Sequence, residues 1–306
     1  MTEQQKTIGK TITLSGTGLH TGQKGTLTFH PAPENHGIKF RRIDLDNKPV
    51  VDALVDNVIS TERGTTLGLN GSKIFTVEHV LAALTGLGID NILIDIDTEE
   101  MPIMDGSSKI FIDVLENAGI IEQNAKKNYI VIKEKILFEI PEKNISVSIE
   151  PAEKFSIEVE IDYETKVLGK QSAKLDDLKD FKTEIAPCRT FVFLHELEFL
   201  LNNNLIKGGD ISNAIVFVNK VVEQKELDRL AELFNKPKVK VKEKGILNNI
   251  DLYFDNEPAR HKLLDLIGDL TLLGRPVLGH VKAVRPGHYT NTQFAKQVKN
   301  KINNYE

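Results

Sequence analysis

The sequence predicts an α+β protein built from two similar halves, and three observations lead to this prediction. A length of 306 residues is enough for two domains of ordinary size. Each half begins with segments in which apolar and polar residues alternate, as in strands, and continues into amphipathic helices. Two pairs of short strings also recur in the same order in both halves, which indicates an internal repeat.

The first half opens with three predicted strands, at 10–16, 25–32 and 38–44. A helix follows at 76–88, because apolar residues recur there at helical spacing. Thr76 is the expected N-cap of this helix, and Gly86 or Gly88 is expected to end it. The half closes with a strand at 90–97, a turn at 101–108 and a helix at 109–119.

The second half repeats this order. It contains predicted strands at 129–139, 144–152 and 155–163, a helix at 193–204, an apolar segment at 214–220, a helix at 259–270, a strand at 277–285 and a last helix. The polar run at 122–128 between the halves is interpreted as a linker. We therefore expect a first domain at 1–124 and a second at 129–306, joined by residues 125–128.

The repeated strings give a register between the halves. "LTFHPA" at 27–32 aligns with "VSIEPA" at 147–152, and "EHVLAALTGLG" at 78–88 aligns with "LDLIGDLTLLG" at 264–274. This register places His79 in the same position as Asp265. If the halves pack around a pseudo-twofold axis, equivalent turns of the two helices would meet between them.

Composition limits the classes of partner and location. A net charge of −5 and a pI near 6.0 argue against nucleic acid as the main partner. The single cysteine, Cys188, excludes a disulfide framework and a thiolate zinc cluster. No apolar run is long enough to span a membrane, and the N-terminus lacks the apolar core of a secretory signal. The prediction is a cytoplasmic protein without a transmembrane segment.

The polar stripe of the 259–270 helix carries His261, Asp265 and Asp269 at intervals of four residues. Such a stripe occurs on most surface helices, so a solvated face is the simplest interpretation. A spacing of four nevertheless puts His261 and Asp265 on one face, near enough to share a cation. Two histidines and a carboxylate with an open fourth position are typical of catalytic zinc, so the hypothesis needs a second histidine.

His79 is the candidate for this second histidine, because the repeat register brings it toward the 259–270 helix. Apolar residues surround it in its own helix, and a structural buried histidine is the more common explanation of such a pattern. The adjacent Glu78 would diverge from His79 by about 100° on a helix. Glu78 is therefore a candidate general base for water, whose pKa zinc lowers to about 7.

Four other residues could complete a hydrolytic site. His288 on a glycine-containing turn is a candidate acid, and Asp269 could orient it and raise its pKa. The hydroxyl of Thr190 could donate to an oxyanion, and Lys262 could hold an anionic group of a substrate. A loop histidine, a strand-edge threonine and a solvated lysine remain the plain alternatives.

Seven separated strings match one protein family, and they occur in the same order as in that family. They are "GTGLHTG" (16–22), "TVEHVLAALTGLGIDN" (76–91), "MPIMDGS" (101–107), "CRTFVF" (188–193), "GGDISNAIVF" (208–217), "ARHKLLDLIGDL" (259–270) and "PGHYTNT" (286–292). On these strings the chain resembles the zinc-dependent UDP-3-O-acyl-N-acetylglucosamine deacetylases of lipid A biosynthesis. They run from near the start of the chain to near its end.

The resemblance implies two similar domains, each a β-sheet layered on paired α-helices, with the helices of both domains facing each other. It also implies particular roles for individual residues: one Zn²⁺ held by His79, His261 and Asp265, Glu78 as base, His288 as acid or cationic stabiliser supported by Asp269, Thr190 at the oxyanion, and Lys262 and Phe191 at the substrate. The implied reaction is hydrolysis of the N-acetyl group of an acylated UDP-amino-sugar, giving acetate and a free amine.

The family further implies one insert per domain, at about 40–70 and about 193–222 here. The second insert would form an apolar passage for the acyl chain, lined by Ile211, Ala214, Ile215 and Val216, although core packing explains these residues equally well. Some members are fused to a downstream acyl-carrier-protein dehydratase, so the resemblance leaves such a fusion open for this chain.

Two other functions stay open on the sequence. The ligand set does not choose the acyl group, so a zinc amidohydrolase acting on another N-acyl sugar is the alternative within enzymes. A non-catalytic protein that binds a sugar nucleotide or a lipid is the alternative outside enzymes, and in it the polar stripe would only be solvated.

Overall fold

The computed structural model describes residues 3–197, 207–208, 213–219, 222–233, 240–242, 245–247 and 250–303. Within these ranges the protein is α+β, as predicted. The strands of the first sheet are, in spatial order, β2 (Ile12–Thr17), β3 (Lys24–Pro31), β9 (Ile92–Ile96), β4 (Ile38–Arg42) and β5 (Val50–Asp52). All neighbours are antiparallel except β4 and β9, which are parallel.

The second sheet repeats this topology. Its strands are, in spatial order, β12 (Ile136–Ile140), β13 (Ile145–Glu150), β19 (His280–Val284), β14 (Ser156–Asp162) and β15 (Lys170–Leu175). Again one pair, β14 and β19, is parallel and the others are antiparallel. The predicted register holds between β3 and β13, because Leu27 and Phe29 are fully buried, as are Val147 and Ile149 at the equivalent positions.

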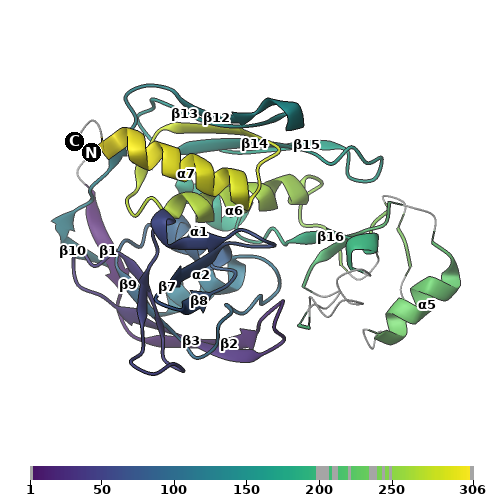
Figure 1. Cartoon of the computed structure of the whole chain (residues 1–306), viewed down its shortest axis with the longest axis horizontal. Coiled ribbons are helices and arrows are strands. Elements are labelled where there is room, and N and C mark those ends of the chain that lie inside the picture. Colours follow the sequence, from purple (N-terminus) through teal and green to yellow (C-terminus); the bar gives the residue numbers. More distant parts are fainter. Residues whose placement is uncertain are drawn as a thin grey trace.

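Two helices from each half lie between the sheets. They are α1 (Glu78–Leu87) and α2 (Lys109–Asn117) from the first half, and α6 (Glu257–Thr271) and α7 (His288–Asn303) from the second. Helix α1 packs on α6, α2 lies against β2, and α7 lies against β12 and β13. Figure 1 shows the resulting order of layers, from the second sheet through its helices and those of the first half to the first sheet.

The α1–α6 contact confirms the pseudo-twofold relation. The hydroxyls of Thr85 and Thr271, which the repeat aligns, lie 2.6 Å apart. Gly268 lets the two helices approach closely, because a Cβ atom there would lie 2.1 Å from the carbonyl oxygen of Glu78. Equivalent turns of the two helices therefore meet, as the sequence register predicted.

The predicted N-cap of α1 is wrong. Thr76 has a φ of 61°, and the residue at the cap position is Val77, without a side-chain cap hydrogen bond. The Thr76 hydroxyl instead donates to the buried carboxylate of Glu100 at 3.4 Å, so a tertiary contact takes the group that would cap the helix. The stop is as predicted, because α1 ends at Gly88 with a φ of 67°, which favours glycine.

The polar run expected to be a linker is mostly a strand. Strand β10 (Ile120–Lys126) pairs antiparallel with β1 (Gln4–Ile8). Most of its polar side chains are exposed, which gives the segment the composition of a linker, while pairing with β1 fixes it as a strand. The link between the halves is shorter than predicted on its N-terminal side, and the domain boundaries themselves stay a prediction.

The remaining elements of the described residues are short except for α5. They are η1 (Val55–Asn57), β6 (Val58–Ser60), β7 (Thr66–Leu69), β8 (Ser72–Ile74), β11 (Ile130–Val131), η2 (Pro141–Lys143), η3 (Leu178–Asp180), α3 (Phe181–Glu184), β16 (Phe191–Phe193), β17 (Ile215–Phe217), α5 (Gln224–Leu233) and β18 (Val277–Leu278). Strands β6, β7 and β8 form a small sheet that overlaps the C-terminal part of the first predicted insert.

The region of the second insert contains a parallel pair, β16 with β17, and Figure 1 shows α5 beyond it at one end of the molecule. Of the helix expected at 193–204, residues 194–197 are helical, Phe193 belongs to β16, and 198–204 lie outside the described residues. No helix in the described part of the chain combines the length and apolar character needed to cross a membrane.

Candidate metal centre

The three predicted metal ligands lie together. His79 comes from the first turn of α1, and His261 and Asp265 come from one face of α6. The Oδ1 atom of Asp265 lies 3.7 Å from Nε2 of His79 and 3.4 Å from Nε2 of His261. One ligand atom from each side chain lies within 4.8 Å of the others, and all three residues are buried. The repeat register predicted this meeting, because His79 and Asp265 are equivalent positions.

The donor atoms suit a divalent metal ion. Nδ1 of His261 lies 3.1 Å from the carbonyl oxygen of Cys188, an arrangement that lets Nδ1–H donate and leaves Nε2 as an acceptor. Among the described residues, the buried Oδ1 of Asp265 has no hydrogen-bond partner. Burial, together with the nearby His261, lowers the pKa of His79 to about 3, so its ring is neutral at pH 7. Neutral imidazoles and an unsatisfied carboxylate oxygen fit a cation.

A buried ion pair fixes the start of α6 relative to the segment that leads into β16. Arg189 donates from Nε to Oε1 of Glu257 at 2.9 Å and from Nη2 to Oε2 at 3.1 Å. Glu257 is fully buried and also accepts the backbone N–H groups of Arg189 and Tyr253. Because Cys188 directly precedes Arg189, this pair also places the carbonyl oxygen that receives the His261 ring.

Glu78 lies beside the cluster, and its buried surroundings favour the neutral form of its carboxyl group. Burial raises the pKa of Glu78 to about 7, although the nearby His288 opposes the shift. Its Oε2 accepts the backbone N–H of Thr65 at 3.0 Å, and its Oε1 lies 3.9 Å from Nε2 of His288. A carboxylate with a pKa near neutrality can take up and release a proton at working pH.

His288 and Asp269 form a buried pair next to Glu78. Nδ1 of His288 lies 3.0 Å from Oδ2 of Asp269, which also accepts the side-chain N–H of Asn291 at 2.8 Å. Burial lowers the pKa of His288, but Asp269 and Glu78 raise it more, to about 9. The ring is therefore protonated at neutral pH in the metal-free protein. Its Nε2 also lies 3.9 Å from Oδ2 of Asp265, so the ring faces the metal cluster.

Lys262 lies in the cluster. Its Nζ donates to Oδ2 of Asp265 at 2.7 Å and lies 5.8 Å from the centre of the Phe191 ring. Burial lowers the pKa of Lys262, but Asp265 and Tyr163 raise it more, so the ammonium stays charged. The Phe191 ring in turn lies 6.4 Å from the His261 ring. Both residues therefore border the candidate metal centre.

A family model described as "LpxC: UDP-3-O-acyl N-acetylglycosamine deacetylase" matches residues 5–238 and 231–300 of this chain. The chain belongs to this deacetylase family. A UDP-3-O-acyl-N-acetylglucosamine deacetylase of Myxococcus xanthus is 40% identical over 303 residues, which cover 99% of this chain and 88% of the relative. The family resemblance found from seven strings is thereby confirmed.

Longer members of the deacetylase family are also similar. Proteins named "Bifunctional enzyme LpxC/FabZ" from Bacteroides thetaiotaomicron and Chlorobaculum tepidum are 46% and 48% identical, over 99% and 96% of this chain. The matches cover 66% and 64% of those two relatives. This chain therefore spans slightly less than two thirds of the length of its bifunctional relatives.

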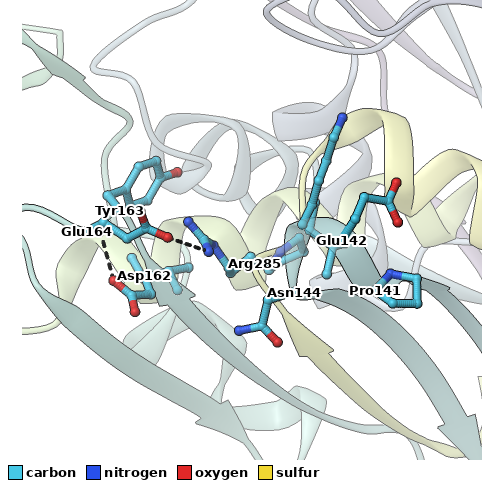
Figure 2. A pocket seen from close by; sticks show the side chains of 11 residues that line it. Pro141, Glu142, Asn144, Asp162, Tyr163, Glu164 and Arg285 are labelled. Carbon is cyan, nitrogen blue, oxygen red and sulfur yellow. Dashed lines mark hydrogen bonds and ion pairs between the residues drawn. The ribbon is translucent and has the colours of Figure 1, made fainter.

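A pocket of about 630 Å³ lies where η2, the end of β14 and the segment after β19 meet (Figure 2). Its lining comes from three segments, 141–145, 161–164 and 285–286. Tyr163, which lines the pocket, lies 5.4 Å from the Phe191 ring, and Phe191 in turn borders the candidate metal centre. Figure 2 shows Arg285 reaching to Glu164, with which it forms an ion pair of 2.9 Å.

The other predicted site residues have different surroundings. Thr190 directly precedes β16, and its backbone N–H donates to the carbonyl oxygen of Gly106; its contact with an oxyanion stays a prediction. Ile215 and Val216 are buried in two separate apolar clusters, and Ala214 beside them is half-buried. A passage lined by these residues stays a prediction, and Ile211 lies outside the described residues.

Several residues of the site were not found from the sequence. They are Thr65, Asn291, Arg189, Glu257 and Tyr163. Arg189 and Asn291 lie within strings that carried the family resemblance, so position in a matching string was the available signal. Thr65 lies outside the seven strings that match the family, so only its contacts in the structure identify it as part of the site.

Proposed function

We propose that this chain hydrolyses the N-acetyl group of a UDP-3-O-acyl-N-acetylglucosamine in lipid A biosynthesis, with one Zn²⁺ at His79, His261 and Asp265. The observation that carries this proposal is the buried cluster of those three ligands with Glu78 and His288 beside it. Family membership supports the substrate, because the related proteins carry the deacetylase name.

Zinc is the proposed metal because two imidazoles and one carboxylate are a ligand set found in catalytic zinc sites. When bound, such an ion supplies Lewis-acid activation of water and of the acetamide carbonyl. The single carboxylate ligand, Asp265, is held by Lys262, which leaves Oδ1 as the atom without a hydrogen bond.

Two side chains move protons in the proposed reaction. Glu78 removes a proton from water as the water oxygen bonds to the acetamide carbon, and its pKa of about 7 suits this step. His288, protonated through its pairing with Asp269, gives a proton to the amide nitrogen as the carbon–nitrogen bond breaks. The products are acetate and the free amino sugar, and Thr190 is proposed to donate to the oxygen that carries negative charge in between.

The pocket of Figure 2 is our candidate for the nucleotide end of the substrate. Its partly exposed Tyr163 ring offers a surface on which a base can stack. Arg285 and Lys143 add cationic groups at its edge, which suit phosphates. Phe191 lies 5.4 Å from the ring of the pocket-lining Tyr163 and 5.8 Å from Nζ of Lys262, so a sugar between the two sites would place its acetamide at the proposed metal ligands.

Metal analysis combined with a deacetylation assay tests the proposed function. The purified protein should contain about one zinc per chain and release acetate from the acylated UDP-sugar. His79→Ala and His261→Ala should lose both metal and turnover, whereas Glu78→Ala should keep the metal and lose turnover. A metal-free protein that binds the nucleotide normally would favour the non-catalytic alternative. Turnover by Glu78→Ala would show that the base is assigned wrongly.

Two further proposals concern the whole protein. The bifunctional relatives support fusion to a downstream acyl-carrier-protein dehydratase as an arrangement open to this chain. The cytoplasmic location also stays a prediction. Sequencing the complete reading frame decides the first proposal, and cell fractionation decides the second.

A further inference from the structure

Thr65 lies at the junction between the proposed base and the proposed acid. It immediately precedes β7 of the small sheet and is fully buried. Its residue number is far from those of Asp269 and His288, and the fold brings the small sheet against both. Two different polar groups of Thr65 reach the two halves of the proposed proton-transfer machinery: the backbone N–H donates to Glu78, and the side-chain hydroxyl donates to Asp269, the partner of His288.

The backbone N–H of Thr65 holds the base. It donates to Oε2 of Glu78 at 3.0 Å, which leaves Oε1 as the oxygen on the side of His288. The preceding residue, Gly64, keeps space around that oxygen, because a Cβ atom there would lie 2.9 Å from Oε1. The loop therefore fixes one carboxylate oxygen and leaves room at the other.

The hydroxyl of Thr65 holds Asp269, the residue that pairs with the proposed acid His288. It donates to Oδ1 of Asp269 at 2.5 Å, while Oδ2 of the same carboxylate faces His288 and Asn291. Thr65 Oγ1 also lies 3.3 Å from Nδ1 of His288. Because Asp269 is fully buried, the loss of the hydroxyl would leave Oδ1 without this donor and free the carboxylate to turn.

We propose that Thr65 is a positioning residue that sets the relative placement of Glu78 and of the His288–Asp269 pair. It touches neither the reacting atoms nor the metal ligands, and acts through the two side chains that transfer protons. This inference rests on the proposed function, since proton transfer by Glu78 and His288 belongs to that reaction. Orientation of catalytic groups affects the chemical step more than substrate binding.

Thr65→Val tests the inference, because valine keeps the shape of threonine and removes only the hydroxyl. We expect kcat to fall by about 10- to 100-fold, with KM within about twofold and zinc content unchanged. Thr65→Ser restores the hydroxyl and should recover most of kcat. Thr66→Val is the matched control, since the same change at the next, also buried, threonine should leave kcat near that of the wild type.

A second readout does not depend on turnover. In the metal-free protein, nitrogen-15 NMR of the His288 ring reports the hydrogen bond from Nδ1 to Asp269. Thr65→Val should shift the Nδ1 signal, and Thr65→Ser and Thr66→Val should leave it close to the wild-type position. This measurement separates the inference from the proposed function, because it can be made on a protein without deacetylase activity.

Three outcomes would overturn the inference: an active Thr65→Val enzyme with wild-type kcat, an equal loss in Thr65→Ser, or an unchanged Nδ1 signal in Thr65→Val. A wild-type protein that shows no deacetylation would instead remove the proposed function. The NMR comparison would then decide by itself whether Thr65 positions His288.

Discussion

Replacing Gly268 with alanine should separate the two helices that carry the metal ligands. A Cβ atom at residue 268 would lie 2.1 Å from the carbonyl oxygen, 2.8 Å from the carbonyl carbon and 3.0 Å from the Cα of Glu78. Favourable contacts between heavy atoms lie at roughly 3.5 Å, so one backbone must move by about 1 Å. The obstacle is main chain in the first turn of α1, which cannot rotate away as a side chain can.

The variant is informative because glycine to alanine stabilises an ordinary helix but should destabilise this one. In an exposed helix interior, glycine to alanine stabilises by about 1 kcal/mol. Overpacking of a close contact costs about 1–3 kcal/mol, and a contact with main chain belongs to the upper part of that range. We therefore expect Gly268→Ala to lower the free energy of unfolding by about 1–2 kcal/mol, as the difference between these terms.

The displaced residues are Glu78 and His79, so function should suffer more than stability. A misplacement of about 1 Å in a catalytic site can cost about 100-fold in rate. Urea unfolding, zinc content and kcat for deacetylation measure the three effects. Gly287→Ala is the matched control, because an added Cβ there meets no atom within 4 Å although it adjoins His288. A Gly268→Ala protein as stable and active as the wild type would refute the close approach of α1 and α6.

Three other predictions follow from the same site. Arg189→Met should destabilise the protein by about 3–5 kcal/mol, because it leaves the buried Glu257 without its cationic partner; urea unfolding measures this loss. In the metal-free protein the pKa of His288 is raised to about 9 from an ordinary value near 6.5, so its contribution to stability is complete below about pH 6.5 and disappears as the pH rises through 9. Urea unfolding at pH 6 and pH 9.5 should show this decline, and His288→Gln should lack it. Adding Zn²⁺ at about 100 times its Kd should stabilise the metal-free protein by about 2.7 kcal/mol, seen as a higher melting temperature, and an equal rise in His261→Ala would place the ion elsewhere.

Much of the candidate site follows from local geometry, and this part was predicted. His261 and Asp265 share a face because four residues make about one helical turn. The repeat register added His79, since a pseudo-twofold contact brings equivalent turns together. Strand alternation likewise located β3 and β14, because buried residues alternate there with half-buried ones, and the apolar–polar pattern also located β13.

Where polar groups bind partners far away in the chain, the sequence pattern gave a wrong prediction or none. Thr76 has the chemistry of an N-cap, but its hydroxyl donates to Glu100 and its backbone takes a positive φ. The segment at 122–126 is polar enough for a linker, yet hydrogen bonds to β1 make it a strand. Neither partner can be read from the local pattern.

The sequence by itself determined the α+β class, the repeat and the candidate ligand set, because these depend on periodicities and repeats along the chain. Only the tertiary structure showed that Thr65 donates hydrogen bonds to both Glu78 and Asp269, and that Arg189 forms a buried ion pair with Glu257. The raised pKa values of Glu78 and His288 also depend on the fold, since burial and charges from other segments cause them. Distances between residues far apart in the chain are set by packing of the whole molecule, and no local periodicity encodes them.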